Sequence, residues 1–363
     1  MKILFIAPLP PPISGQTVAV NFLYDYLAPI YEVKVINTNK KSFSSGLTSF
    51  SRIIEVLSFF FLIFKNKSNY EKFYITSSES IAGNIKDLFI YFILINRLKD
   101  ITIHIHGGSF VSQILKRNKF LFVINKFFLR RFNSVIVLSK SHHNNIKECL
   151  GLSNIEIVPN FVEKKLFISD EDLIKKFQNT EKVNIIFFSN LIKGKGFDLL
   201  LKAYLNLDVE IQRFSTLQFA GSFESKVEEE SFLRLIDNYE NIQYLGLLEG
   251  EAKKQFLNNA IVFCLPTSFN EGQPISILEA YASGCVVLAT PKEGIMDILK
   301  VNENGFFISE TDTKILEDKL KEIVLEKDKY RPIGENNLLY AKNNFQLIEY
   351  QQSLENILTK IKY

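Results

Sequence analysis

Two glutamates, Glu271 and Glu279, mark the part of the chain with the clearest chemical signal. Between them stand residues typical of a loop that opens into a helix: Gly272, Gln273, Pro274, Ile275 and Ser276. Pro274 suits the first turn of a helix, where free backbone N–H groups favour an anion such as a sugar diphosphate. Carboxylates on either side of that anion can accept hydrogen bonds from the hydroxyl groups of a nucleotide sugar. The alternative is an acidic residue before the helix and a solvated glutamate within it.

A pair of histidines follows an apolar segment earlier in the chain, at residues 104–108. Side chains alternate along a strand, which puts His104 and His106 on one face, with His106 at the carboxyl end. A zinc site needs three or four ligands, and the remaining histidines, His142 and His143, have no spacing that supports one. We therefore expect a core position for His104 and no metal site.

The segment from Glu271 to Ala280 resembles the E-G-x-P-x-S-x-L-E-A element of family 4, a large family of retaining glycosyltransferases with the GT-B fold. The resemblance implies that Glu271 contacts the donor sugar and that Glu279 contacts the ribose hydroxyl groups of the donor. It extends along essentially the whole chain, but its specific motifs lie between Asn190 and Gly284.

Two other motifs match the family less completely. The segment 189–198 is similar to the G-R-L-x-x-x-K-G element, in which the Arg and the Lys hold the donor diphosphate. Lys195 matches the Lys, whereas Asn190 stands where the Arg is usual. The Pro-rich loop 8–17 resembles the family's first loop, which implies that Gly15 approaches the diphosphate. That loop lacks the G-x-G-x-x-G pattern of dinucleotide-binding proteins.

The resemblance also implies a mechanism, transfer with retention at the anomeric carbon. It places His106 near the transferred sugar and makes His106, Glu271 and Lys195 the catalytic set. The departing diphosphate needs its charge stabilised, and Lys195 together with helix N-termini would do this by preorganised electrostatics. No Asp-x-Asp motif argues for a metal, so we expect a metal-independent enzyme whose donor substrate is its sole non-protein group.

Residues 115–131 combine apolar side chains with six cations and no acid. The cations are Lys116, Arg117, Lys119, Lys126, Arg130 and Arg131. A basic, aromatic-rich amphipathic helix is typical of a membrane-surface element, and each cation near an anionic leaflet contributes up to about 1 kcal/mol. A helix that faces the core and has a basic edge is the alternative. No nucleic-acid motif accompanies the cations, so we expect no nucleic-acid partner.

Length and charge support a two-part organisation. The 363 residues exceed one ordinary core and suit two domains of about 150–200 residues each. Up to Lys165 the chain has 21 Lys+Arg against 10 Asp+Glu, a charge of +11, and the rest has 22 against 30, a charge of −8, which sum to +3. The basic half suits an anionic partner. The three cysteines indicate reduced thiols in a cytosol rather than a disulfide framework.

Nothing at the N-terminus or in the apolar stretches predicts export or a membrane span. The chain enters a strand-like run directly after Met1, which predicts no secretory signal. The Phe-rich stretches 57–64 and 88–95 are far shorter than the roughly 20 apolar residues that a spanning helix needs.

Short apolar strands alternate with helical stretches in both halves, a pattern typical of parallel sheets covered on both faces. The expected strands are 2–7, 32–37, 72–76, 101–106 and 134–139, then 183–190, 216–221, 241–245, 260–266 and 285–290. We therefore expect an α/β protein of GT-B architecture, with two Rossmann-like domains and a cleft between them. Residues 1–165 would form an acceptor-binding, membrane-facing domain, 166–344 a nucleotide-sugar-binding domain, and 345–363 a helix that crosses back to the first domain.

The combined expectation is a cytoplasmic enzyme held peripherally on the inner face of the cell membrane. It would move a sugar from a nucleotide sugar, with UDP favoured over GDP, to a lipid-linked glycan acceptor of bacterial surface polysaccharide, such as O-antigen (lipopolysaccharide) or capsule. One alternative is a catalytically degenerate assembly protein of the same fold, with Asn190 as its first symptom. Another is a soluble transferase that acts on a small cytosolic acceptor. The absent glycine pattern disfavours a nicotinamide-dependent dehydrogenase.

Overall fold

The computed structural model describes residues 1–39, 49–178 and 181–360, and the chain forms two compact units. The first unit holds Met1–Asn160, Glu271–Gln273 and the chain from Ile348, and the second holds Phe161–Asn270 and Pro274–Leu347. The expected domain boundary after Lys165 lies close to this division. The placement of Glu271–Gln273 with the first unit is a feature that the sequence did not indicate.

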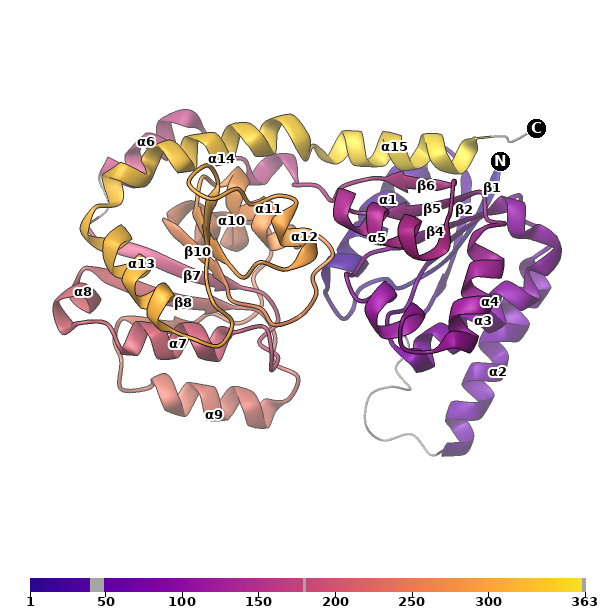
Figure 1. Ribbon diagram of the computed structural model, residues 1–363, viewed down its shortest axis with the longest axis horizontal. Coiled ribbons are helices and arrows are strands. Elements are labelled where there is room, and N and C mark those ends of the chain that lie inside the picture. The colour runs from indigo at the N-terminus through magenta and orange to yellow at the C-terminus, as the bar shows by residue number, and fades with distance from the viewer. Residues whose placement is uncertain (40–48, 179–180, 361–363) are drawn as a thin grey trace. The chain divides into compact units, whose positions relative to one another are not determined.

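The first unit is built on a six-stranded parallel sheet with the order β2-β1-β3-β4-β5-β6. Its strands are β1 (Lys2–Ala7), β2 (Glu32–Asn37), β3 (Lys72–Thr76), β4 (Ile101–Ile105), β5 (Ser134–Val137) and β6 (Ile155–Ile157). Its helices are α1 (Gly15–Leu27), α2 (Ser49–Asn66), α3 (Ile81–Ile93), α4 (Lys119–Leu129), α5 (Lys140–Leu150) and most of α15 (Leu347–Thr359), with the shorter η2 (Ile95–Asp100) and η3 (Phe110–Leu115) (Figure 1). The sequence prediction missed β6, a short edge strand that buries little.

Side-chain caps explain where several helices of this unit begin. Ser14 accepts a hydrogen bond from the Thr17 N–H at the start of α1, and Ser80 accepts one from the Gly83 N–H at the start of α3. Such caps satisfy backbone donors that have no partner within the helix. Each cap follows the end of β1 or β3 closely, so both helices begin beside the carboxyl edge of the sheet, where ligands bind in such folds.

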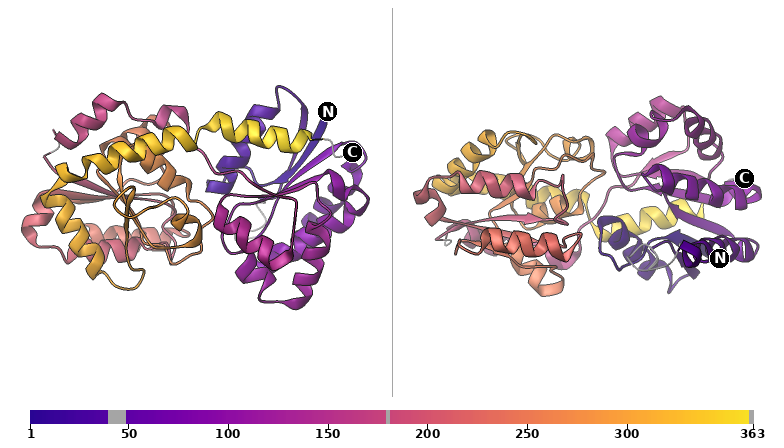
Figure 2. Two further views of the ribbon diagram at one scale, coloured as in Figure 1. Left: turned by 45° about the horizontal axis from the view of Figure 1, so that its top comes forward. Right: turned by 90° about the horizontal axis from the view of Figure 1, so that it is seen from below.

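The second unit is also a six-stranded parallel sheet, with the order β12-β11-β10-β7-β8-β9. Its strands are β7 (Val183–Phe188), β8 (Ser215–Ala220), β9 (Ile242–Tyr244), β10 (Val262–Leu265), β11 (Val286–Ala289) and β12 (Gly305–Phe307). Its helices are α6 (Asp170–Gln178), α7 (Phe197–Leu205), α8 (Val209–Arg213), α9 (Lys226–Ile236), α10 (Gly250–Asn259), α11 (Ile275–Ala282), α12 (Glu293–Met296), α13 (Lys314–Leu325) and α14 (Arg331–Asn344), with the short η4 (Lys164–Leu166) and η5 (Lys327–Tyr330) (Figure 2). The sequence prediction also missed the edge strand β12.

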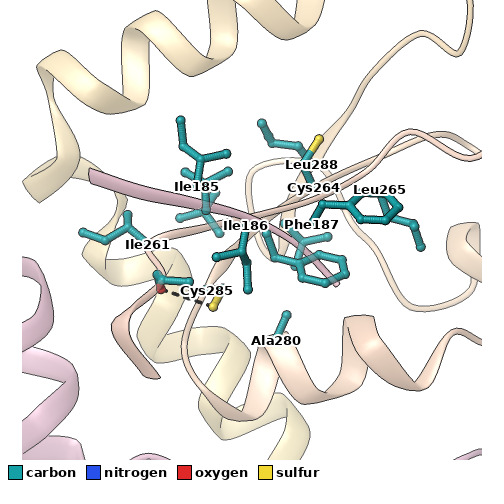
Figure 3. Packing of buried hydrophobic residues seen from close by; sticks show 14 of the residues in the cluster. Ile185, Ile186, Phe187, Ile261, Cys264, Leu265, Ala280, Cys285 and Leu288 are labelled. Carbon is teal, nitrogen blue, oxygen red and sulfur yellow. Dashed lines mark hydrogen bonds between the residues drawn. The ribbon is translucent and has the colours of Figure 1, made fainter. Parts of the chain in front are cut away.

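The core of the second unit is almost continuously apolar. All four residues of β10 and all four of β11 are buried. Cys264 on β10 and Leu288 on β11 pack with Phe187 of β7, as Figure 3 shows. Strands covered on both faces have no solvated side, which explains why these segments read as apolar runs rather than as alternating patterns.

The strand order of this sheet reverses between β7 and β10. From β7 the chain moves outward through β8 to β9, and from β10 it moves outward in the opposite direction through β11 to β12. This is the Rossmann order, in which ligands bind at the carboxyl ends of the strands beside the reversal. A ligand-binding site in this unit is therefore expected at the loops that follow β7 and β10.

The C-terminal helix α15 packs on the first unit. The Tyr350 hydroxyl donates to the Ala19 carbonyl oxygen at 3.3 Å, and the Gln351 amide donates to the Phe22 carbonyl oxygen at 2.9 Å. Glu355 accepts hydrogen bonds from the hydroxyls of Tyr26 and Tyr31, both at 2.8 Å. These hydrogen bonds hold α15 against α1 and the segment that follows α1.

Candidate active site

The loop after β7 carries Lys195 between two glycines in left-handed backbone. Gly194 has a φ of 96° and Gly196 a φ of 85°, a region that residues with a Cβ atom seldom adopt. A methyl group at Gly196 would lie 2.2 Å from the carbonyl oxygen of Pro266, in the loop after β10. The second glycine is therefore required for the two loops to approach each other.

The loops after β7 and β10 are joined by hydrogen bonds beside the reversal of strand order. The backbone N–H of Ser268 donates to the Gly194 carbonyl oxygen at 2.7 Å, and the Ser268 hydroxyl donates to the same oxygen at 3.0 Å. The ammonium of half-buried Lys195 lies 5.7 Å from the ring centroid of Phe269. The sequence-predicted lysine thus stands where a ligand of a Rossmann sheet is expected.

Asn190 is half-buried at the end of the same strand. Its backbone packs against Gly221, where a methyl group would lie 1.9 Å from the Ser189 carbonyl oxygen and 3.2 Å from the Asn190 nitrogen. Lys193, the cation that follows in sequence, is exposed. Asn190 and Lys195 therefore belong to one loop, with the amide at its beginning and the ammonium at its end.

Glu279 lies inside α11, buried rather than solvated. Pro274 occupies the N-cap of this helix, directly before Ile275, and its carbonyl oxygen accepts from the N–H groups of Ile277 and Leu278. Ser276 and Ile275 are half-buried in the first turn. Glu279 is 3% exposed, which excludes the alternative of a solvated helix glutamate.

Lys253 of α10 forms an ion pair with Glu279 at 2.5 Å, and the sequence reasoning missed it. Burial raises the pKa of Glu279, and the charge of Lys253 opposes that shift. The Lys253 ammonium also lies 5.5 Å from the Phe188 ring centroid, at the end of β7. A lysine on a polar helix gives no sequence signal for a partner 26 positions away, so only the tertiary packing reveals the pair.

Glu271, Gly272 and Gln273 belong to the first unit together with His106. A methyl group at Gly272 would lie 1.9 Å from the His106 carbonyl oxygen, so the glycine is required for this contact. Gln273 is anchored twice: its side-chain oxygen accepts from the Asn160 N–H at 2.6 Å, and its carbonyl oxygen accepts from the Asn160 side-chain amide at 2.8 Å. The structure therefore brings the Glu271–Gln273 segment and His106 into one neighbourhood.

His106 follows β4 and stacks on His104, with ring centroids 3.8 Å apart. Its Nε2 atom is buried and has no hydrogen-bond partner, and burial lowers the pKa of His106 to about 3. His104 is in the core, as expected, with its Nδ1 atom 2.7 Å from the Tyr74 hydroxyl. His106 is therefore a neutral imidazole at physiological pH, suited to a hydrogen bond and not to charge stabilisation.

Gly15 is the first residue of α1 and is exposed. The preceding Ser14 takes part in a reciprocal cap, in which the Thr17 hydroxyl accepts from the Ser14 N–H at 2.8 Å. The helix start is thus formed by Ser14 and Thr17, and Gly15 leaves the end of α1 without a side chain.

The predicted basic helix α4 has one buried side and one exposed side. Leu121, Asn125 and Phe128 face the core, whereas Phe120 is 71% and Val123 is 63% exposed. Lys116, Arg117, Lys119, Arg130 and Arg131 are exposed, and Lys126 is half-buried.

Two neighbouring helices extend this exposed surface. α2 contacts α3 and α3 contacts α4, and the three run side by side in Figures 1 and 2. We call nine of the exposed apolar residues of these helices the apolar face: Leu57, Phe61, Phe64, Ile85, Phe89, Phe92, Phe120, Val123 and Phe127. Cations lie over its rings, Arg131 at 3.7 Å from the Phe127 centroid and Lys67 at 4.2 Å from the Phe64 centroid. Exposed apolar residues gathered on adjacent helices are typical of an interaction surface.

Residues 1–39, 49–178 and 181–360 contain neither a cluster of metal-ligand side chains nor a helix that could span a membrane. There, no three or more His, Cys, Asp or Glu side chains gather in a way that could hold a metal ion. The Asp-x-Asp string at 170–172 opens α6, where Asp170 pairs with Lys342 and Asp172 accepts from Ser169. No helix in the same ranges combines the length and apolarity needed to cross a bilayer.

Comparison with known proteins gives a consistent result. Residues 169–339 match the family described as glycosyl transferases group 1. These similarities support a glycosyltransferase. An uncharacterized glycosyltransferase of Methanocaldococcus jannaschii is 24% identical over 70% of this chain and 68% of its own length. The Campylobacter jejuni GalNAc-alpha-(1->4)-GalNAc-alpha-(1->3)-diNAcBac-PP-undecaprenol alpha-1,4-N-acetyl-D-galactosaminyltransferase is 26% identical over 59% of each chain.

The fold is shared with solved glycosyltransferase structures. Anabaena HepE, solved in complex with UDP and glucose, superposes with a TM-score of 0.73, covering 99% of this chain and 100% of that chain at 15% identity. The two six-stranded parallel sheets with their helices are thus two Rossmann-like domains of the GT-B fold, as the sequence predicted. At this identity the likeness concerns the fold alone.

Proposed function

We propose that this glycosyltransferase moves a sugar from a nucleotide sugar to a lipid-linked glycan acceptor, with retention at the anomeric carbon and without a metal. The observation that carries the donor half is the loop with Lys195, held by Ser268 beside the strand reversal of the second unit. A cation at that point can stabilise the charge of a departing diphosphate by preorganised electrostatics. The UDP bound to HepE supports a UDP-sugar over a GDP-sugar.

The roles proposed for the site residues follow their positions. Lys195 would neutralise the diphosphate, and Glu279 would accept hydrogen bonds from the ribose. Glu271 and neutral His106 would orient the transferred sugar, since both lie in the neighbourhood of Gly272. An uncharged imidazole with an unused Nε2 atom can donate to or accept from a sugar hydroxyl.

The acceptor half of the proposal rests on the apolar face and its surrounding cations. Aromatic side chains exposed on three adjacent helices, with lysines and arginines between them, fit the interface of an anionic membrane. We propose that this face holds the enzyme at the inner surface of the cell membrane, where a lipid-linked acceptor is presented. The undecaprenol-linked substrate named for the Campylobacter relative supports this class of acceptor, and surface polysaccharide is the proposed product.

Thermal unfolding with UDP-, GDP- and ADP-sugars, each with and without EDTA, tests the donor site. A ligand at a hundredfold excess over its Kd adds about 2.7 kcal/mol to stability. We expect stabilisation by one nucleotide class, unchanged by EDTA. Stabilisation that EDTA abolishes and Mg²⁺ restores would contradict the metal-free site. If none of these nucleotide sugars stabilises the protein, the degenerate assembly protein becomes the better interpretation, because Asn190 already departs from the usual arginine.

A further inference from the structure

Glu79, a residue that sequence reasoning did not single out, lies beside the turn that carries His106. It follows β3, and its Oε1 atom accepts a hydrogen bond from the Ser109 backbone N–H at 3.2 Å. The Phe110 backbone N–H also donates to this carboxylate. A methyl group at Gly107 would lie 2.1 Å from the Oε2 atom, so the carboxylate rests directly on the turn.

The same turn also meets the Glu271–Gln273 segment. A methyl group at Gly272 would lie 1.9 Å from the His106 carbonyl oxygen and 3.1 Å from the Gly107 Cα atom. The turn therefore lies against both the Glu79 carboxylate and the Gly272 backbone. The His106 ring has no hydrogen bond at its Nε2 atom, so its direction depends on the stacking with His104 and on the backbone of this turn.

Burial and neighbouring groups bring the pKa of Glu79 close to neutral pH. Burial raises the pKa of Glu79 to about 7, with a further upward contribution from the charge of Glu271 and opposition from the two backbone N–H groups. His106, the first residue of this turn, stays neutral because burial lowers its pKa to about 3. On α3, the Asp87 carboxylate accepts a hydrogen bond from the Ser78 backbone N–H at 2.7 Å and forms an ion pair with Lys86 at 3.4 Å.

We propose that Glu79 is a positioning residue of the transfer reaction, whose ionised carboxylate holds the 106–109 turn against Glu271 and Gly272. This inference rests on the proposed function for its catalytic consequence. A carboxylate accepts a backbone N–H more strongly than a neutral acid does. Protonation of Glu79 therefore loosens the turn, and the alignment of His106 with Glu271 is lost.

The test compares Glu79→Gln with Glu79→Ala over pH 5.5–9, with donor and acceptor varied separately. Gln keeps an oxygen that can accept from Ser109 but cannot titrate, whereas Ala removes the support. Wild-type kcat should fall up to tenfold per pH unit below about 7, as expected for an essential base. E79Q should lose this acid limb, and E79A should lose about 100-fold in kcat at pH 8 with little change in the KM for the donor. Glu156→Gln, at an exposed position on β6, is the matched control and should keep the wild-type profile.

Three kinetic outcomes overturn the proposal. An acid limb that persists in E79Q would assign the titration to another group. A wild-type kcat in E79A would show that the turn needs no support from this carboxylate. A KM defect for the donor alone would place Glu79 in substrate binding and would also overturn the positioning role.

A stability measurement separates failure of this proposal from failure of the proposed function. Because the folded pKa of Glu79 is above its usual value, the folded state binds the proton more tightly than the unfolded state. Its stabilising contribution is present at low pH and is lost as pH rises through about 7. The Tm of E79Q relative to wild type should therefore rise between pH 5 and pH 8. A wild type without transfer activity would reject the proposed function alone, whereas a Tm difference that is constant over this range would reject the buried, titrating Glu79.

Discussion

The two units are built on the same kind of sheet but differ in what surrounds it. In the first unit, α2, α3 and α4 expose the apolar face, and the half of the chain up to Lys165 has a net charge of +11. In the second, the remainder of the chain has a net charge of −8, and the candidate ligand groups lie in loops beside the strand reversal. The same kind of sheet thus carries an exposed apolar surface in one unit and a lysine-bearing loop in the other. Function depends on the residues that a fold carries and not on the fold itself.

The buried carboxylates show the same contrast. Glu279 in the second unit is paired with Lys253, which opposes the effect of burial on its pKa. Burial raises the pKa of Glu79 in the first unit to about 7; the charge of Glu271 adds to this shift, and two backbone N–H partners oppose it. The Glu279 carboxylate is therefore held by a cation, whereas the Glu79 carboxylate beside the His106 turn responds to pH. The ionised Glu79 carboxylate lowers the stability of the folded state, because burial disfavours its charge. Such a loss of stability is consistent with a functional position.

The largest effect is expected at the Lys195 loop of the second unit. Lys195→Ala should lower kcat/KM by about 100-fold or more, because one preorganised contact to the developing diphosphate charge is removed. Lys193→Ala, which removes an exposed lysine of the same loop, should stay within about threefold of wild type. Steady-state kinetics with the donor found by thermal unfolding measures both. Equal losses in the two variants would assign the effect to the general charge of the loop.

The next effect tests the fixed ion pair of the second unit. Lys253→Met leaves the Glu279 carboxylate buried without its cation, so the free energy of unfolding should fall by about 3 kcal/mol at pH 8. The loss should be smaller at pH 5: without Lys253 the pKa of Glu279 rises further, and the protonated acid needs no partner.

Denaturant unfolding at the two pH values checks this, with Lys254→Met as the adjacent control. The double variant with Glu279→Gln should recover most of the stability at pH 8. A loss that is independent of pH would mean that Lys253 contributes through packing and not through its charge.

The smallest effect concerns the surface of the first unit. Replacing Phe61 and Phe120 by Ser removes two rings that are 66% and 71% exposed and should weaken binding to anionic vesicles by about tenfold per ring. The matched control replaces Val227 and Leu235 by Ser, on the exposed side of α9 in the second unit, and should bind as wild type does. Vesicle sedimentation at low and high salt measures both pairs. Equal binding by all variants would favour the soluble transferase that acts on a small acceptor.

Much of the fold could be predicted because it depends on local pattern. Apolar runs such as 2–7 and 72–76 matched their strands residue for residue, since buried parallel strands have few sequence solutions. The edge strands β6 and β12 were missed because each has three residues, mostly outside the core. Their existence depends on the neighbouring strand that they pair with and not on their own sequence.

By itself the sequence determined the candidate residues Lys195, Glu271, Glu279 and His106, through their types and places after predicted strands together with the family motifs that they resemble. The tertiary structure alone decided their electrostatics. Lys253 reaches Glu279 from another helix, and Glu79 meets the His106 turn from another loop. Both contacts join segments distant in the chain, and the pKa of a group is set by burial and by neighbours in space, neither of which a linear pattern contains.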